Sequence, residues 1–349
     1  MTTSAAKHPS QVGTVRIAPV ASIPGVLAQL GFEPAAILAE LNFDIRLFDD
    51  PDTVIPYAER TRLLEQCAEK TGCRHFGHLM ARNTGPSSFG IAGFLMQQCP
   101  DVATALRAFV RYSHLHVSGA VVYLDEGPES AFLGYSILEP GLEATEQLAD
   151  GAVTAAFNIL RALCGPAWRP MEVCFAHRKP ENTRPFKQYF DAPLTFNEGR
   201  NGVVFSASWL HTPLRSSDPN LRELLQLQIN QLESRHSEDF AEQVRRVLRS
   251  AVLTHHATAA HVANLFSSHQ RTLNRRLRDC GTCFRDLLNE CRCEIARQLL
   301  ADSSTSLTEI AATLDYADTS AFARAFRRQR CAGNCQPWSG NWSMTACSQ

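Results

Sequence analysis

Two segments in the C-terminal third of the chain carry side chains that can bind nucleic acid. In RTLNRRLRDC, Leu273 and Leu277 recur at helical spacing and lie on one face of a helix. The side chains left on the opposite face are Arg271, Asn274, Arg275 and Arg278. The arginine fork matches phosphate oxygens and guanine edges, and asparagine matches adenine. The segment therefore predicts a helix that lies in a DNA major groove.

The second segment, TSAFARAFRRQ, follows the same plan. Phe322 and Phe326 form its apolar face, and Phe322 takes the place that Leu273 holds in the first segment. The residues expected to be exposed are Thr319, Ser320, Ala323, Arg324, Arg327 and Arg328. Hydroxyl and guanidinium groups of this kind contact phosphates and base edges. The sequence thus predicts two DNA-recognition helices of the same type, which are called the first and second reading helices below.

A shorter helix and a tight turn precede each reading helix. In the first module, Thr258 caps AAHVANLF and SSHQ makes the turn. In the second, Ser306 and Glu309 form a capping box, the helix runs on through Leu314, and DYAD makes the turn. Helix, turn and an arginine-bearing second helix form the arrangement of a helix-turn-helix module.

Two longer helices are predicted beside these modules. The helix at 240–252 is expected to expose Arg245, Arg246 and Arg249 on its outer face. The segment FRDLLNECRCEIARQLL, residues 284–300, is predicted to be a connecting helix, because its apolar residues recur at steps of three and four. Its 17 residues rise roughly 25 Å, which with the flanking turns would set the reading helices about one DNA turn, roughly 34 Å, apart.

The N-terminal two thirds predict an α+β domain. Helices are expected at about 26–41 with a break at Gly31, at 55–72, and on both sides of Pro100. From about residue 119 the pattern predicts a β-hairpin, then a helix at 143–164. MEVCFAH, PLTFNEG and GVVFSA bring the total to about five strands, expected to be antiparallel without regular βαβ alternation.

A leucine-rich helix is predicted between the two parts, at 216–239. Its apolar residues are Leu221, Leu224, Leu225, Ile229 and Leu232. Such a stripe either packs on the preceding domain or pairs with a second copy of itself. The domain boundary is expected near 234–239.

Composition restricts the function classes. The chain has 349 residues, 44% of them hydrophobic, and a net charge of −1, so DNA binding must rest on a local patch. No lysine follows Lys187; recognition of phosphate and guanine or a GC-rich genome would each favour arginine in this way. There is no secretory signal and no apolar window of membrane-spanning length. We expect a cytoplasmic protein with its 12 cysteines reduced and no membrane partner.

Signals for catalysis are weak. There is no glycine-rich phosphate loop, GxSxG or HExxH, so neither an enzyme nor a cofactor is expected. His114 and His116 point to different faces of a helix, which favours a surface or capping role over a metal site. The cysteines expected in the core are Cys67, Cys73, Cys99, Cys164 and Cys174.

Further cysteines in the C-terminal part suggest zinc binding or thiol-based sensing. They are Cys280, Cys283, Cys291, Cys293, Cys331 and Cys335. Cys291 lies on the apolar stripe of its helix and Cys293 is expected on a different face, so a shared metal site is disfavoured. No metal is predicted, and a thiol-responsive protein stays an alternative.

The segments RTLNRRLRDCGTCFRDLL and RCEIARQLLADSSTSLTEIAATLDYADTSAFARAFRR resemble the bipartite helix-turn-helix domain of AraC/XylS-type bacterial transcription regulators. HFGHLMARN, SFGIAGFLMQQCPDVATALRAFVRY, WRPMEVCFAH and NGVVFSASWL are similar to the N-terminal arabinose-binding-type domain of the subgroup that includes ornithine-utilisation regulators. The resemblance implies a domain that binds a small effector, through residues left open here, and mediates dimerisation. It places DNA contacts on Arg271, Asn274, Arg275, Thr319, Ser320 and Arg324.

Three places depart from the pattern of the family. His269 stands where a capping serine is usual, and Asp315 where glycine precedes an aromatic residue; Asp tolerates a left-handed backbone well. After Arg328 the sequence QRCAGNCQPWSGNWSMTACSQ lacks helical periodicity and lacks the residues that are usual in the family. Our hypothesis is that a frame change replaced the last helix, which resequencing the gene across the codon for Gln329 would test.

The sequence therefore predicts an effector-responsive, dimeric transcription activator with an α+β N-terminal domain and an all-α double helix-turn-helix domain. The expected partners are double-stranded DNA, a small-molecule effector, RNA polymerase and a second copy of the chain. The expected segments are a flexible N-terminus at 1–20, the effector domain at 21–215, the linker helix at 216–239, the DNA-binding domain at 240–328 and an atypical tail at 329–349. The alternatives are a DNA-binding-impaired remnant and a thiol- or redox-responsive regulator.

Overall fold

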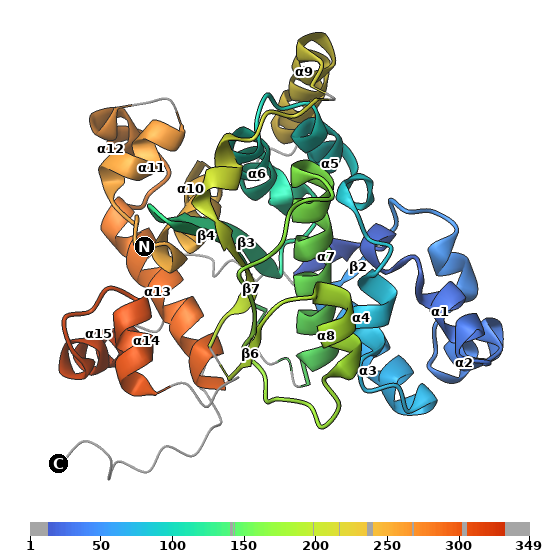
Figure 1. Ribbon diagram of the computed structural model, residues 1–349. Helices are drawn as coiled ribbons and strands as arrows, with labels where there is room; N and C mark the ends of the chain where they lie inside the picture. The colour runs from blue at the N-terminus through green and yellow to red at the C-terminus, as the bar shows by residue number, and fades with distance from the viewer. Residues whose placement is uncertain are drawn as a thin grey trace, which may run out of the picture.

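The protein consists of an α+β part and an all-helical part that lie side by side (Figure 1), which confirms the predicted fold class. The computed structural model describes residues 13–331 apart from 140, 141, 143, 198, 216, 236–239, 267, 268 and 302–305. The frame-change hypothesis concerns residues that lie almost wholly outside this range. Within the range, α15 reaches Cys331, three residues past the predicted end of the DNA-binding domain.

A five-stranded sheet forms the centre of the α+β part. Its order is β3 (Ala120–Glu126), β4 (Ser130–Ile137), β7 (Asn201–Ser206), β5 (Glu172–Phe175) and β6 (Leu194–Phe196). The predicted hairpin is β3 and β4. The expectation of antiparallel strands throughout was wrong for β5 and β6, which pair in parallel. The short helix α8 (Arg184–Phe190) crosses between them, and its seven residues gave no periodic signal.

Helices cover one face of this sheet. The long helix α7 (Glu146–Cys164) lies along it, with α6 (Val102–Tyr112) beside it (Figure 1). Alternate strand residues, Val122 on β3 and Leu133 on β4, pack with Phe157 of α7 in the larger core cluster. The predicted helix ends are present, since the Asp101 carboxylate accepts a hydrogen bond from the Thr104 amide and Gly165 ends α7.

A second hydrophobic core of the α+β part lies among its N-terminal helices. Its helices are α1 (Ile23–Gln29), α2 (Pro34–Glu40), α3 (Tyr57–Thr71) and α4 (Phe76–Ala81), with 3-10 turns η1 (Ala18–Val20) and η2 (Ile45–Phe48). The predicted break at Gly31 and the helix end at Gly72 are confirmed, and both glycines have positive φ, 87° and 65°.

A small two-stranded sheet, β1 (Thr14–Arg16) with β2 (Val54–Pro56), was not predicted because each strand has only three residues. The prediction that residues up to 20 are flexible was wrong for 14–20. Val15 and Ile17 are buried in the core there, which fixes the segment in place.

Helix α9 (Pro219–Arg235) lies in the predicted linker segment and packs on α5 (Gly90–Gln97). Leu225 and Ile229 join a small core with Leu95 and Tyr112. The helix stands at one edge of the molecule, at the top of Figure 1. The leucine stripe is therefore divided between a packed side and an exposed one.

The helical part contains all the helices predicted for it. They are α10 (Phe240–Leu253), α11 (Ala259–Leu265), α12 (Gln270–Asp279), α13 (Phe284–Ala301), α14 (Leu307–Thr313) and α15 (Thr319–Cys331). Helix α13 runs between the pair α11 and α12 and the pair α14 and α15, as Figure 1 shows. Leu287 of α13 packs in the core of the first helix-turn-helix module, and Ile295 of α13 packs in the core of the second module. These two cores are called the first and second helical cores. Because α10 also contributes Leu248 to the first core and Val252 to the second, a pair of helices connects the modules.

Two arginines of α10 face this partner helix. The Arg245 Nη2 donates to Glu290 at 3.1 Å, and Arg249 donates two hydrogen bonds to Glu294. The prediction that these arginines point outward was therefore wrong. Both glutamates lie on α13, so the pairing depends on how two distant segments pack, which helical periodicity does not reveal.

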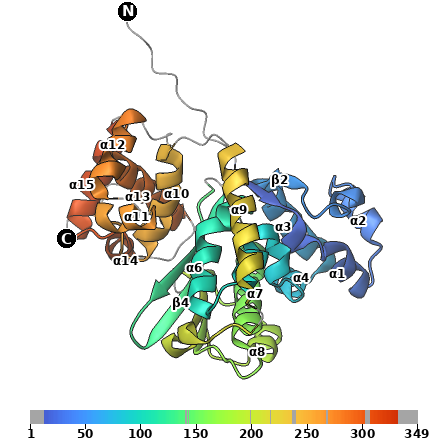
Figure 2. The same ribbon diagram turned by 90° about the horizontal axis from the view of Figure 1, so that it is seen from above.

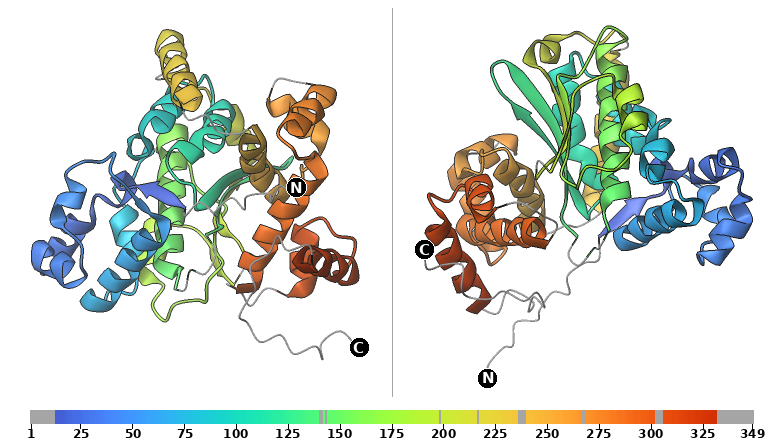
Figure 3. Two further views of the ribbon diagram at one scale, coloured as in Figure 1. Left: turned by 180° about the vertical axis from the view of Figure 1, so that it is seen from behind. Right: turned by 60° about the horizontal axis from the view of Figure 1, so that its bottom comes forward.

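The helical part contacts the outer face of the sheet at β3. Val121 and Leu138 pack in the second helical core with Val252, and Tyr123 packs in a cluster with Leu253. Figure 2 shows α10 beside the β3–β4 hairpin, and Figure 3 shows the helical part on the far side of the sheet from α1 and α2. The two parts therefore share an apolar contact.

Candidate nucleic-acid interface and ligand pocket

The first reading helix, α12, is anchored by its leucines. Leu273 and Leu277 are fully buried, while Arg271 and Arg275 are exposed and Asn274 is half-buried. His269 occupies the N-cap position, and its side chain makes no capping hydrogen bond, as expected from the departure at this site.

The second reading helix, α15, is anchored by Phe322, whose ring lies 5.6 Å from Tyr316 and 5.5 Å from Phe326. Ser320 and Arg324 are exposed, and Thr319 is half-buried. Nothing is described for the side chains of residues 327–331. Of the predicted DNA-binding residues, Arg271 and Arg275 are therefore exposed on α12, and Ser320 and Arg324 are exposed on α15.

The turn before α15 tolerates its unusual residue. Asp315 has φ 57°, the left-handed conformation expected where the family has glycine. Its carboxylate accepts a hydrogen bond from His255 Nδ1 at 2.6 Å and lies 3.6 Å from Arg292 Nη2. The Asp side chain thus contacts His255, which follows α10, and Arg292 within α13, contacts that glycine could not make.

The arginines of this region fall into two groups. Arg245 and Arg249 form ion pairs with glutamates of α13. Arg271, Arg275 and Arg324 form no ion pair with any described residue. Guanidinium groups without an internal carboxylate are free to bind phosphates and guanine edges. The structure therefore separates the structural arginines from the candidate DNA-binding ones.

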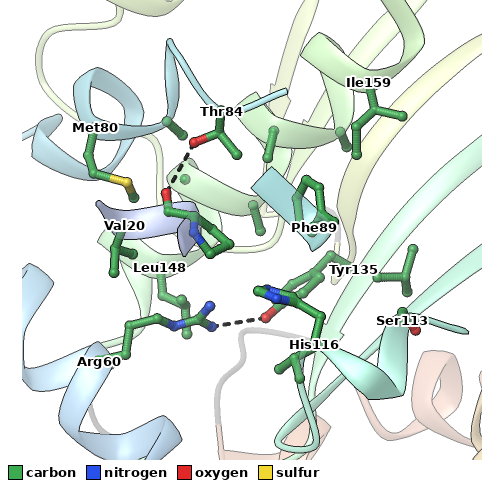
Figure 4. A pocket seen from close by; sticks show the side chains of 18 of the residues that line it. Val20, Arg60, Met80, Thr84, Phe89, Ser113, His116, Tyr135, Leu148 and Ile159 are labelled. Atoms are coloured by element: carbon green, nitrogen blue, oxygen red, sulfur yellow. Dashed lines mark hydrogen bonds between the residues drawn. The ribbon is translucent and has the colours of Figure 1, made fainter. Parts of the chain in front are cut away.

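A second candidate site lies inside the α+β part. A cavity of about 70 Å³ is lined by α7, the inner face of β3 and β4, and the N-terminal helices (Figure 4). By volume it holds several water molecules or a small ligand. Most of its wall is apolar, with Phe89, Leu133 and Ile159 among the lining side chains.

Polar groups gather at one end of this cavity. The Arg60 Nη2 donates to the Tyr135 hydroxyl at 3.2 Å, and the Tyr57 and Tyr135 hydroxyl oxygens lie 2.7 Å apart. His116 lies beside them in Figure 4, and burial together with the Arg60 and Arg16 charges lowers its pKa to about 3. His116 is therefore neutral at physiological pH.

Both parts of the chain match known families. Residues 31–214 match the family described as "Arabinose-binding domain of AraC transcription regulator, N-term", and residues 262–331 match "Helix-turn-helix domain". The chain belongs to the AraC family of transcription regulators. Both matched domains are those of a DNA-binding regulator, and neither is described as catalytic.

Relatives of this AraC-family chain span nearly its whole length. The "HTH-type transcriptional regulator VirS" of Mycobacterium tuberculosis is 23% identical, over 87% of this chain and 90% of that protein. The "Ornithine utilization regulator" of Pseudomonas aeruginosa is 23% identical, over 90% and 94%. A crystal structure of the transcriptional regulator CdpR from Pseudomonas aeruginosa matches with 20% identity and a TM-score of 0.40, over 89% of this chain and 96% of that one.

Sequence reasoning missed the polar end of the AraC-family pocket. The surface or capping role expected for His116 was wrong, since this residue is 6% exposed and lines the cavity. His114 is half-buried, and its Nδ1 lies 3.0 Å from the Arg111 carbonyl oxygen. Arg60 lies on the apolar side of α3 together with Leu63 and Leu64. An arginine three and four residues before two leucines of an apolar helix face was the signal in the sequence that could have identified the site.

The cysteines of this regulator are mainly buried. The five expected in the core are confirmed as buried: Cys67, Cys73, Cys99, Cys164 and Cys174. Cys291 and Cys293 are also both buried. Burial raises the pKa of Cys291 to about 12, which keeps this thiol protonated. Cys280 and Cys283 are half-buried, and Cys335 lies outside the described residues.

Two further structural findings bear on the predictions. The described residues of the AraC-family chain contain no group of three or more His, Cys, Asp or Glu side chains placed to hold a metal ion. No single described helix is long and apolar enough to cross a membrane. Among the described residues only the pair Ala18–Gln29 and Pro34–Glu40 passes by length and composition, and it is bent by 114°.

Proposed function

We propose that the chain activates transcription when a small molecule binds in the cavity between α7 and the sheet. In this proposal α12 and α15 bind operator DNA, two copies of the chain act together, and RNA polymerase is the partner at the promoter. A regulator of this kind works in the cytoplasm, where the DNA lies. The proposal is supported by the two matched domains, of which the first is described as the arabinose-binding domain of a transcription regulator and the second as a helix-turn-helix domain.

The observation that carries the DNA-binding role is the set of arginines that form no ion pair with any described residue. Arg271 and Arg275 lie in the first two turns of α12, and Arg324 lies in the second turn of α15. In helix-turn-helix proteins the N-terminal part of the second helix contacts base edges. We infer that Asn274, Thr319 and Ser320 complete the contacts, as donors and acceptors beside these arginines.

The link between effector and DNA runs through strand β3. Val122 lines the cavity, and the preceding residue Val121 points to the other face of the sheet, where it packs against the second helical core. A ligand that moves β3 or β4 therefore changes the surface on which α10 rests. The proposed mechanism is a shift in the population of DNA-competent arrangements of the two modules.

Gel-shift titration of the full chain with its own upstream DNA tests the proposal. Arg275→Ala and Arg324→Ala should each weaken binding by about 1–3 kcal/mol, roughly 5- to 150-fold. Arg46→Ala is the control, because Arg46 is an exposed arginine of the α+β part that pairs with Asp44. Unchanged affinity in both variants would contradict the assignment, and failure of the wild-type chain to bind would favour the impaired remnant.

A further inference from the structure

The cavity described above has one charged end. Arg60 is 5% exposed, its guanidinium carbon lies 4.6 Å from the centre of the Tyr57 ring, and its Nε has no hydrogen-bond partner among the described residues. Arginine stays protonated in proteins. A buried positive charge without a counter-ion costs free energy. Within the described part of the chain, the guanidinium at this wall therefore lacks a neutralising group.

The side chains around Arg60 do not supply that negative charge. No aspartate or glutamate in the described part of the chain forms an ion pair with it, and the groups that act on it are Tyr57 and Tyr135. Burial raises the pKa of Tyr57 well above its usual value, so this phenol stays protonated. His116 is neutral, and its buried Nδ1 has no partner in the described chain. These groups offer hydrogen bonds but no counter-charge.

The other end of the cavity is apolar and is kept open by small side chains. Helix α7 contributes four of them: Gly151, Ala152, Ala155 and Ala156. Phe109, Leu133 and Ile159 complete that wall. Among the described lining residues Arg60 is the one with a full charge, so polar substituents far from it would be buried without partners. A ligand that fits must therefore carry one anionic group on an apolar body.

We propose that the effector is a small apolar monocarboxylate, whose carboxylate binds Arg60 and whose hydrocarbon part lies along the small residues of α7. This inference rests on the proposed effector-dependent function. A carboxylate can accept two parallel hydrogen bonds from a guanidinium. The Tyr135 hydroxyl and the His116 ring lie beside Arg60 and provide further hydrogen-bonding groups. The small volume favours a short aliphatic or aromatic acid over a long chain.

Calorimetric titration of the full chain with matched acids and amides tests this inference. The probes are hexanoate against hexanamide and benzoate against benzamide, which differ in charge but little in shape. At least one acid should bind, tenfold or more tightly than its amide, because a hydrogen-bonded charge pair is lost with the amide. Arg60→Gln should abolish this preference, and Tyr135→Phe should reduce it several-fold while leaving the charge in place.

Arg62→Gln is the matched control, since Arg62 lies on the same helix, is exposed and pairs with Glu59. It should keep the full preference for acids. Equal binding of acids and amides, or no binding of any acid at millimolar concentration, would overturn the inference whether or not the variants fold. Gel-shift titration of the same protein reports separately on DNA binding, so loss of DNA binding with retained acid binding would contradict only the proposed function.

Discussion

The Arg249 guanidinium donates hydrogen bonds from Nε and Nη2 to the two carboxylate oxygens of Glu294, each at 3.0 Å. Arg249 comes from α10 and Glu294 from α13, the two helices that contribute to both helix-turn-helix cores. Arg245 and Glu290 repeat the contact one helical turn away. These pairs fix how α13 lies on α10, and so help to hold the two modules at one spacing.

Arg249→Ala should destabilise the helical part without removing a DNA contact. The change leaves Glu294 without its bidentate partner, and a hydrogen bond to a charged group contributes about 1.5–3 kcal/mol. Urea unfolding monitored by circular dichroism measures the free energy of unfolding. Arg271→Ala, at an exposed arginine without an ion pair to any described residue, should leave that free energy within about 0.5 kcal/mol of the wild type. Equal stability of the two variants would show that the pair contributes nothing.

Gly77→Ala should disrupt the crossing of α4 and α7. A Cβ at Gly77 would lie 1.9 Å from the backbone carbonyl oxygen of Gln147, and the Gly77 amide already donates to the Gln147 side chain at 2.8 Å. Because backbone atoms cannot move aside, overpacking should cost about 3 kcal/mol. The change would be measured as the free energy of unfolding of the α+β part in urea.

Gly25→Ala is the matched control for that change. Gly25 is also helical, but it is exposed, and a Cβ there would meet nothing within 4 Å. Alanine should therefore stabilise α1 by about 0.5–1 kcal/mol through its higher helix propensity. A loss of stability at Gly25 as large as that at Gly77 would rule out the close helix crossing as the cause.

Local signals in the sequence predicted most of the secondary structure. The capping box of Ser306 and Glu309 forms as expected, with hydrogen bonds in both directions. Thr258 accepts a hydrogen bond from the His261 amide, and Gly72 ends its helix in the left-handed conformation. Each of these features depends on residues within one helical turn, and for that reason the amino-acid order alone determines them.

Contacts between distant segments could not be predicted in the same way. The Arg60 guanidinium and the Tyr135 hydroxyl meet although 75 positions separate them. Arg249 was expected outside because its charge is typical of an exposed position, whereas Glu294 on another helix makes its burial favourable. The exposure of Arg271, Arg275 and Arg324 could be predicted because it depends only on the spacing of apolar residues along one helix. The pocket required knowledge of the packing of α3, α7 and the sheet.

His78 should make the stability of the fold fall as the pH is lowered. It is buried, its Nδ1 lies 2.9 Å from the Thr154 hydroxyl, and burial followed by the charges of Arg82 and His75 lowers its pKa from 6.5 to about 3. Below pH 6.5 the unfolded chain gains a proton that the folded chain does not take up. Between pH 7 and pH 5 this should cost about 2 kcal/mol of unfolding free energy.

The difference between wild type and His78→Gln isolates this effect. The comparison is necessary because burial raises the pKa of Glu65 to about 7, and this group changes stability in the opposite direction over the same range. Glutamine does not titrate and can still hydrogen-bond to Thr154. The variant should therefore lose about 2 kcal/mol less than wild type between pH 7 and pH 5. Parallel pH dependence of the two proteins in urea unfolding would contradict the expectation.

Leu224→Glu should convert a dimer into a monomer if α9 forms the contact between two copies. Leu221, Leu224 and Leu227 recur every three residues and are 42%, 60% and 52% exposed. Each leucine would enter a two-fold interface twice, and burial of one such side chain contributes about 1.5–3 kcal/mol. The dissociation constant, measured by sedimentation equilibrium, should therefore rise at least a hundredfold.

Arg222→Gln provides the control, since Arg222 is also exposed on α9 but is neither three nor four residues from any of the three exposed leucines and so lies off their side. It should leave the dissociation constant unchanged. Ile229 and Leu225 hold α9 against α5 from the opposite side, so the helix itself should persist in both variants. A monomeric wild-type chain, or a dimer that tolerates Leu224→Glu, would show that the exposed leucines do not mediate self-association.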